Sequence, residues 1–236
     1  MKIIAGNWKM NGSRTALDDM VDSVSRVAGN DLRIMMFVPY TMLRTGNDTV
    51  MIGAQNVSKF DAGAHTGDVS AAMVRDAGAV ATLVGHSETR DALHDTNADV
   101  ALRAMHAIDN DLLPIICVGE TDIERKTGIG EKIVVHGVRE SVPKNAKNGG
   151  FIIAYEPRWA IGRGITPTAQ EIADMHQIIR DTLIDMGLGD TPILYGASVT
   201  AQNVREIINI KNVSGVLIGG ASLKKQDFIP IIENVK

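Results

Sequence analysis

The chain has 236 residues, of which 44% are hydrophobic, 22% charged and 4% aromatic, a composition typical of folded globular proteins rather than disordered ones. The 24 basic and 28 acidic residues leave a formal net charge of −4. This balance provides no broad positive surface for nucleic acid or for an anionic membrane, so an anionic ligand must be held by local groups.

The chain carries no pattern that predicts export or a membrane span. Its first residues, MKIIAGNWKMNG, contain too short an apolar run for a signal peptide, and no run approaches the roughly 18 apolar residues that a spanning helix needs. The one cysteine, Cys117, excludes an intramolecular disulfide. We therefore expect a protein of the reducing cytoplasm.

Short apolar runs recur along the chain, and they are continuous rather than alternating, which is typical of parallel strands buried on both faces. They lie at residues 2–7, 33–39, 50–55, 80–86, 113–120, 151–157, 192–198 and 214–222. The segments between them predict helices, because polar N-cap residues precede amphipathic runs. The clearest helical segments are 13–28 after Ser13, 96–110 after Thr96, and the run from Thr168 to Gly187. Residues 39–50 leave room only for a truncated helix or a bare loop.

Eight strands that each feed a helix divide the chain into units of about 30 residues, the length that a strand–helix–strand unit needs. A closed (β/α)8 barrel spanning residues 1–236, with no domain boundary, accounts for the whole chain. A doubly wound open sheet is the alternative.

In a barrel of parallel strands the functional site lies at the carboxyl ends of the strands. Polar residues or glycines follow four of the predicted strands, namely Asn7 and Lys9, His86 and Glu88, Glu156, and Gly219 and Gly220. Together they offer a carboxylate base, an imidazole, a cation and backbone amides for a phosphate. The glycine pair begins a short helix, whose N-terminus attracts anions.

Six motifs, in order between residues 6 and 223, resemble those of the triosephosphate isomerase family. They are GNWKMNG, VGHSETR, ICVGET, AYEPRWAIGRG, YGASV and IGGASL. The resemblance runs end to end and implies a single-domain TIM barrel. It further implies an isomerase of glycolysis and gluconeogenesis that interconverts dihydroxyacetone phosphate and D-glyceraldehyde 3-phosphate through an enediolate, without a metal or another cofactor.

The resemblance also implies the catalytic roles. Glu156 is the base that moves a proton between adjacent carbons, His86 is the electrophile, Lys9 supplies fixed positive charge beside Asn7, and Glu88 is a buried carboxylate near the lysine. A helix predicted to begin after His86 favours an uncharged imidazole. The triosephosphate isomerase family is itself the known case of this tuning, and we take the neutral electrophile from it.

The resemblance implies a phosphate cradle and a lid as well. The cradle consists of Ser198, Gly219, Gly220 and the amide of Gly162. The lid, which closes over Glu156 and excludes water, includes Pro157, Trp159, Ala160, Ile161 and Gly164.

Residues 59–68 resemble the long third loop by which the family's subunits interlock, with Thr66 reaching Asn7 of the partner subunit and Glu88 of the partner subunit. We therefore expect a homodimer. His65 stands where an apolar residue is more usual, so a charge there at acidic pH would weaken the dimer.

The chain departs from the family pattern at Ala197, where a second glycine is usual, and at Arg158, Arg163 and Pro167 in the lid segment. These departures leave open a barrel retained as a phosphate-binding scaffold with little turnover. A phosphate-binding barrel enzyme of the tryptophan-pathway type is a further alternative, which the motifs around Lys9, His86 and Glu156 disfavour. The other histidines, at 65, 94, 106, 136 and 176, lack metal-ligand spacing. We expect Cys117 to be a packed strand residue.

Overall fold

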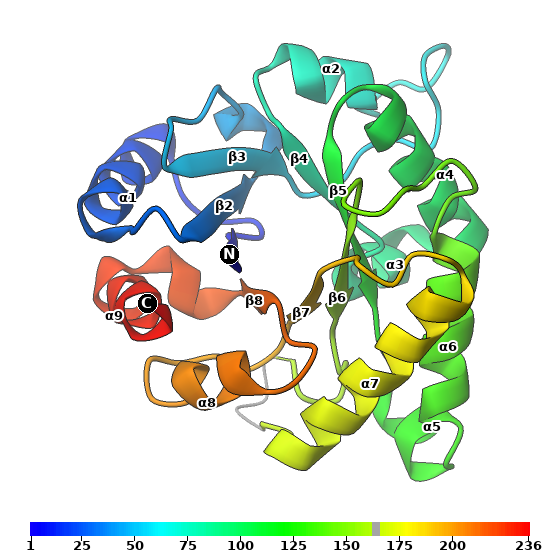
Figure 1. The fold of residues 1–236 in the computed structure, drawn as a ribbon. Coiled ribbons are helices and arrows are strands. Elements are labelled where there is room, and N and C mark those ends of the chain that lie inside the picture. Colours follow the sequence, from blue (N-terminus) through cyan, green and yellow to red (C-terminus); the bar gives the residue numbers. More distant parts are fainter. Residues whose placement is uncertain (162–165) are drawn as a thin grey trace.

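A computed structural model of the chain describes residues 1–161 and 166–236. Its strands form one closed barrel whose order follows the chain, and each neighbouring pair is parallel (Figure 1). The strands are β1 (Lys2–Asn7), β2 (Leu32–Val38), β3 (Val50–Ala54), β4 (Ala81–Val84), β5 (Leu113–Val118), β6 (Ile152–Tyr155), β7 (Ile193–Tyr195) and β8 (Gly215–Ile218). Pairing of β1 with β8 closes the barrel. This confirms the predicted barrel and excludes the open sheet.

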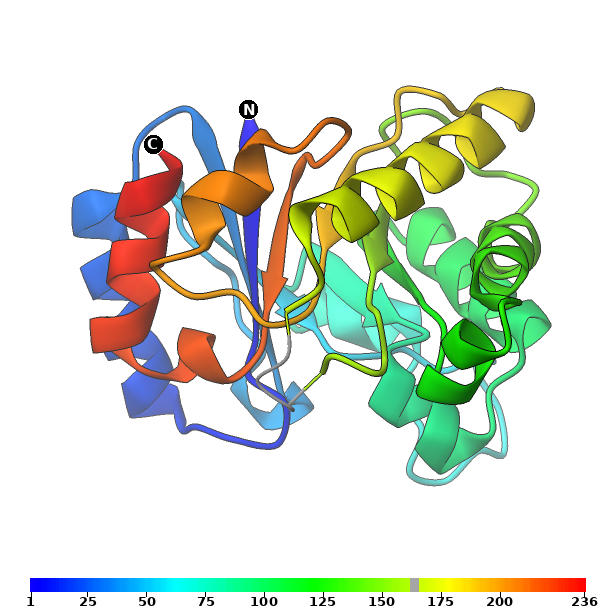
Figure 2. The ribbon, with the colours of Figure 1, turned by 90° about the horizontal axis from the view of Figure 1, so that it is seen from below.

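Helices surround the barrel on its outer side (Figures 1 and 2). The α-helices are α1 (Arg14–Val27), α2 (Ala71–Asp76), α3 (Ser87–Leu93), α4 (Asn97–Asp109), α5 (Asp122–Lys126), α6 (Gly130–Ser141), α7 (Ala169–Asp185), α8 (Val204–Asn209) and α9 (Lys225–Val235). The 3₁₀ helices η1 (Tyr40–Met42) and η2 (Gly220–Leu223) follow β2 and β8. Of the truncated helix and the bare loop that the sequence left open for residues 39–50, the structure has the truncated helix, η1.

The predicted N-caps form because each side chain satisfies a backbone N–H that the first helical turn leaves free. Ser13 Oγ accepts from the Ala16 N–H at 3.2 Å. Thr96 and Thr168 each close a capping box with an acidic residue three positions later. These local contacts begin α1, α4 and α7 where the sequence predicts them.

The apolar core has two layers, because successive strand residues point to opposite faces of the sheet. One set fills the barrel: Ile3, Ala5, Met35, Phe37, Ala81, Leu83, Ile115, Cys117, Ile152, Ala154, Leu194 and Leu217. The larger set packs between the strands and the helices. Both faces must therefore be apolar, which explains the continuous runs. The expectation that Cys117 is a packed strand residue agrees with its place inside the barrel.

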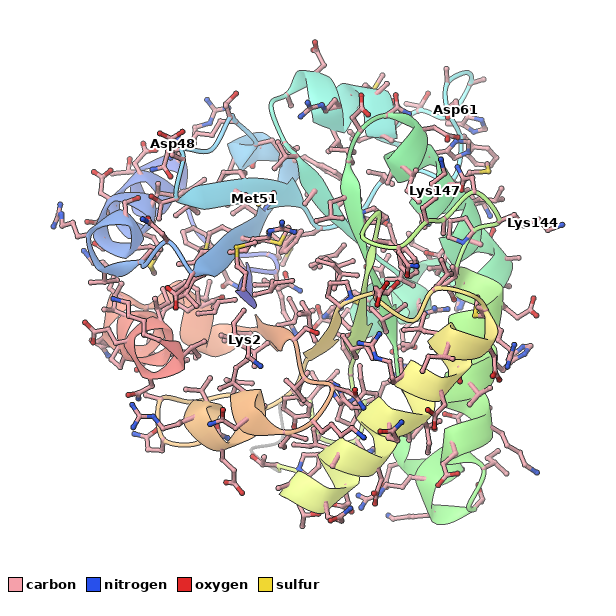
Figure 3. All side chains as sticks on the ribbon, viewed as in Figure 1. Lys2, Asp48, Met51, Asp61, Lys144 and Lys147 are labelled. Atoms are coloured by element: carbon pink, nitrogen blue, oxygen red, sulfur yellow. The ribbon has the colours of Figure 1, made fainter. Side chains whose placement is uncertain are left out.

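The two ends of the barrel differ in character. Figure 3 shows Lys2 and Met51 near the barrel at the end where the strands begin, while Lys144 and Lys147 lie further out. Lys2 Nζ donates to the carbonyl oxygens of Ile208 at 2.7 Å and Val213 at 2.9 Å, which ties β1 to the segment before β8. Both chain termini also lie at this end (Figure 2). Because all neighbouring strands are parallel, the carboxyl ends of the strands lie together at the opposite end of the barrel.

Within residues 1–161 and 166–236, the structure contains no helix of sufficient length and apolar character to cross a membrane.

Candidate active site

A cavity of about 340 Å³ opens at the carboxyl ends of the strands. It brings together predicted site residues that are far apart in the sequence: Asn7, Lys9, His86, Glu156, Ile161, Ser198, Gly219 and Gly220. Ala197 and Thr166 also line it. A cavity of this size suits a small-molecule ligand.

Glu156 follows β6 directly and has its side chain in the cavity. Its backbone N–H donates to the carbonyl of Val118 at 2.8 Å, which fixes the end of β6 against β5. The side chain is only 5% exposed, and Oε1 lies 3.3 Å from Nε2 of His86. The carboxylate is therefore held out of bulk water and against the imidazole.

His86 is the N-cap of α3, and its Nδ1 accepts the backbone N–H of Glu88 at 3.2 Å. A ring nitrogen that accepts a hydrogen bond carries no proton, so the single proton of the neutral imidazole is on Nε2. Nε2 faces the Glu156 carboxylate and the cavity. The capping contact therefore presents an uncharged N–H donor to a substrate oxygen.

Lys9 has a left-handed backbone, with φ of 52°, which is uncommon outside glycine and is often found at functional sites. Its backbone N–H donates to Asn7 Oδ1 at 3.0 Å, and its carbonyl accepts from Gln55 Nε2 at 2.9 Å. Its ammonium lies 2.5 Å from Glu88 Oε1. Three polar side chains thus hold the lysine in place.

The glycines after β8 line one side of the cavity. Gly220 begins η2, and a Cβ added there would meet no atom within 4 Å, so the space beside this glycine is open. A Cβ at Gly219 would lie 3.7 Å from Lys9 Cε. Trp8 Nε1 donates to the carbonyl of Ser222 at 3.0 Å, so the segment carrying Lys9 is tied to η2. Lys9 and the two glycines therefore line the same part of the cavity.

Comparisons with known proteins agree with this geometry. A model of the triosephosphate isomerase family matches residues 2–235. The chain belongs to the triosephosphate isomerase family. Proteins named triosephosphate isomerase from Xanthobacter flavus and Caulobacter vibrioides are 42% and 43% identical to it over 241 residues, covering 99% and 98% of this chain and 97% and 95% of theirs. The crystal structure of triosephosphate isomerase from Bartonella henselae matches it with a TM-score of 0.89 at 34% identity, over 99% of this chain and 98% of that one.

Glu120 and Arg125, which the sequence did not single out, contact Trp159 in the segment after Glu156. Glu120 Oε1 accepts from Trp159 Nε1 at 2.7 Å and from the Tyr155 hydroxyl at 3.0 Å. Arg125 lies over the Trp159 ring, 3.7 Å from its centroid, and pairs with Glu171 at the start of α7. Burial raises the pKa of Glu120. Glu120 lies in the ICVGET motif, which was the only sequence signal for it.

Of the predicted lid, Ile161 lines the cavity, and the carbonyl of Ala160 accepts from Oγ of the lining residue Ser198 at 3.4 Å. Pro157 and Trp159 lie in the segment that leads to them. Gly162 and Gly164, together with Arg163, lie outside the described residues.

Cys117 lies inside the barrel beside Glu156. Burial, and then the charge of Glu156, raises the pKa of its thiol well above the usual value. The side chain therefore stays a protonated thiol, which suits packing and not nucleophilic attack.

The expectation that Glu88 is buried is wrong for the single chain, because its side chain is 58% exposed. Glu88 lies in the first turn of α3 on the surface, where it reaches across to Lys9. Within the part of the chain that the structure describes, its ion pair therefore lies open to solvent.

Thr66 is exposed and does not line the cavity of its own chain. It lies in the loop of residues 59–68, on which Figure 3 labels Asp61. Ser58 donates to Asp68 at 2.7 Å, and the rings of Phe60 and His65 stack 3.8 Å apart. The loop thus has internal order but presents its polar tip to the outside.

Proposed function

We propose that Glu156 and His86 are the base and the electrophile in this protein's interconversion of dihydroxyacetone phosphate and D-glyceraldehyde 3-phosphate. The observation that carries the proposal is the pairing of a nearly buried carboxylate with a neutral imidazole, whose facing atoms are 3.3 Å apart in the cavity. A carbon acid beside a carbonyl needs both, because the base must act while the new oxyanion is stabilised.

In the proposed reaction, Glu156 takes a proton from C1 of dihydroxyacetone phosphate, and the electron pair moves to the carbonyl oxygen to form an enediolate. The Nε2–H of His86 and the ammonium of Lys9 stabilise the negative charge on the oxygens. Glu156 then returns the proton to C2, while the hydroxyl proton moves from O1 to O2. C1 is oxidised as C2 is reduced within the same molecule, so the proton transfers need no external oxidant or reductant and these side chains suffice without a cofactor.

Lys9 is held by Asn7 and Glu88, and we assign to these two residues the task of placing its ammonium at the substrate. The amides of Gly219 and Gly220, with Ser198 and Gly162, are proposed to bind the phosphate dianion. One lysine and several amides are enough for a dianion in a protein of net negative charge. Pro157, Trp159, Ala160, Ile161 and Gly164 are assigned to a lid that keeps water from the enediolate.

We further propose a cytoplasmic homodimer. The single cysteine is consistent with a reducing compartment. The exposed loop that carries Thr66, and an exposed Glu88 beside the catalytic lysine, are consistent with a second subunit covering this edge of the site.

The test compares the parent with Glu156→Gln, which removes the base while keeping the size and polarity of the side chain. Conversion of D-glyceraldehyde 3-phosphate is followed through a coupled dehydrogenase. We expect kcat to fall by roughly three orders of magnitude or more with little change in KM, because the carboxylate acts mainly in the transition state. Glu206→Gln on the exposed side of α8 is the matched control and should keep the parent's kcat.

A folded parent that binds inorganic phosphate but does not turn over would instead support the scaffold alternative. Ala197→Gly would then be the next variant, because Ala197 lines the cavity where the family usually has glycine.

A further inference from the structure

An arginine stands two residues after the proposed base. The backbone N–H of Arg158 donates to the carbonyl of Glu120 at 3.0 Å, which anchors the main chain beyond Pro157. Its side chain reaches Asp91. One nitrogen, Nη2, lies 2.5 Å from Oδ1 and 2.6 Å from Oδ2 of Asp91.

Asp91 belongs to α3, the helix that His86 caps. The ion pair therefore joins the segment that follows Glu156 to the helix that holds His86, across 67 residues of sequence. It forms a second connection between the two catalytic segments, in addition to the 3.3 Å contact between Glu156 and His86 themselves.

The charged side chains of Arg90 and Asp95, near this ion pair in the sequence, bind other partners. Arg90 donates to the carbonyls of Gly85 and Cys117 and to the side chains of Asn97 and Ser141. Asp95 is paired with Arg103 at 2.8 Å. Arg90 is thus engaged in supporting the inner side of α3, and Arg158 is the arginine that pairs with Asp91.

We propose that Arg158 and Asp91 are positioning residues for the isomerisation: their ion pair holds the start of the lid segment against α3 and thereby keeps Glu156 aligned with His86. The inference rests on the proposed function. Neither residue touches the substrate, and both act through the two catalytic side chains. Because catalysis depends on alignment within a fraction of an ångström, a contact of this kind affects kcat more than KM.

The exposure of the pair limits its effect. The Arg158 side chain is 28% exposed and that of Asp91 is 65% exposed, so water and salt weaken the attraction. We therefore expect a loss of roughly two- to fivefold in kcat when either charge is removed, the range that half-exposed ion pairs supply.

The experiment measures kcat and KM for D-glyceraldehyde 3-phosphate in the parent, Arg158→Gln, Asp91→Asn, the double variant and Arg158→Lys. We expect each single variant to lose roughly two- to fivefold in kcat with KM little changed, and the double variant to lose no more than the single ones. Arg158→Lys should regain most of kcat, since a single nitrogen makes both contacts to Asp91.

Salt gives a second readout. At saturating substrate and about 0.5 M NaCl, the ratio of parent to Arg158→Gln kcat should approach one, because the pair is screened. Arg139→Gln and Asp185→Asn remove a similar surface pair, 3.0 Å apart between α6 and α7, and should leave kcat unchanged at low and high salt.

The inference is overturned if kcat is unchanged in the single variants, if their losses add in the double variant, or if lysine fails to restore kcat. Thermal unfolding of every variant separates a loss of alignment from a loss of folded protein. Failure of the proposed function would be distinct, because Glu156→Gln would then retain turnover. With Glu156→Gln inactive and the Arg158 variants fully active, only the positioning role is refuted.

Discussion

His176 should make the stability of the protein fall as the pH drops below neutrality. It lies on α7 with no exposed surface, packs edge-on against Tyr155 with ring centroids 6.0 Å apart, and has Nδ1 3.4 Å from the carbonyl of Asn212. Among the residues that the structure describes, Nε2 has no hydrogen-bond partner. The pKa of His176 is lowered from 6.5 to about 4. Burial is the main cause and the positive charge of Arg180 a smaller one, while the hydrogen bond to the Asn212 carbonyl opposes them.

The sign follows from proton uptake. The unfolded chain binds a proton at His176 near pH 6.5, whereas the folded chain binds one only near pH 4. Unfolding therefore takes up a proton between these values, and the free energy of unfolding decreases as the pH falls through this window. This difference in pKa lowers the free energy of unfolding by about 3 kcal/mol once the pH is below 4. About 2 kcal/mol of this decrease occurs between pH 7 and pH 5.

The assay is urea unfolding at one fixed protein concentration, at several pH values from 8 to 5, for the parent, His176→Asn and His136→Asn. Asparagine can donate to the Asn212 carbonyl but does not titrate, so the pH dependence of the His176→Asn free energy should be smaller than the parent's by about 2 kcal/mol between pH 7 and pH 5. His136 is exposed on α6, and its variant should follow the parent. An equal pH dependence in the parent and His176→Asn would refute the reasoning, whatever the stability of the variant at pH 7.

Further predictions concern the packing around the site and the dimer. Gly119→Ala would place a Cβ 1.8 Å from the Glu156 carbonyl oxygen, so we expect at least a tenfold loss of kcat; a loss below twofold would contradict this. Arg125→Met removes the cation over Trp159 and should shift its fluorescence emission and lower the free energy of unfolding by about 1 kcal/mol, with Lys126→Met as the control. Sedimentation at low protein concentration should give a smaller dimer fraction at pH 5.5 than at pH 8, and His65→Phe should remove the difference. Equal dimer fractions in the parent would count against a role of His65 in the interface.

Structural features that depend on contacts between residues close together in the sequence can be predicted from the sequence alone. Continuous apolar runs predict the barrel strands, because residues facing the barrel interior and residues facing the helices are both buried. Ser13, Thr96 and Thr168 predict helix starts, since a cap bonds to a backbone group three residues away. The contact that makes His86 Nδ1 an acceptor is of the same local kind, spanning two residues.

Contacts between distant segments required the tertiary structure. Closure of the barrel brings the strand ends together, and only then does Gln55 hold the Lys9 backbone, Glu120 bind Trp159, and Arg158 reach Asp91. No periodicity or short motif encodes such pairs, because their geometry depends on the lengths and directions of the intervening strands and helices. The exposure of Glu88 is of this kind as well: the sequence alone determined that an acid follows His86, and the packing around α3 decided how much of that acid faces solvent.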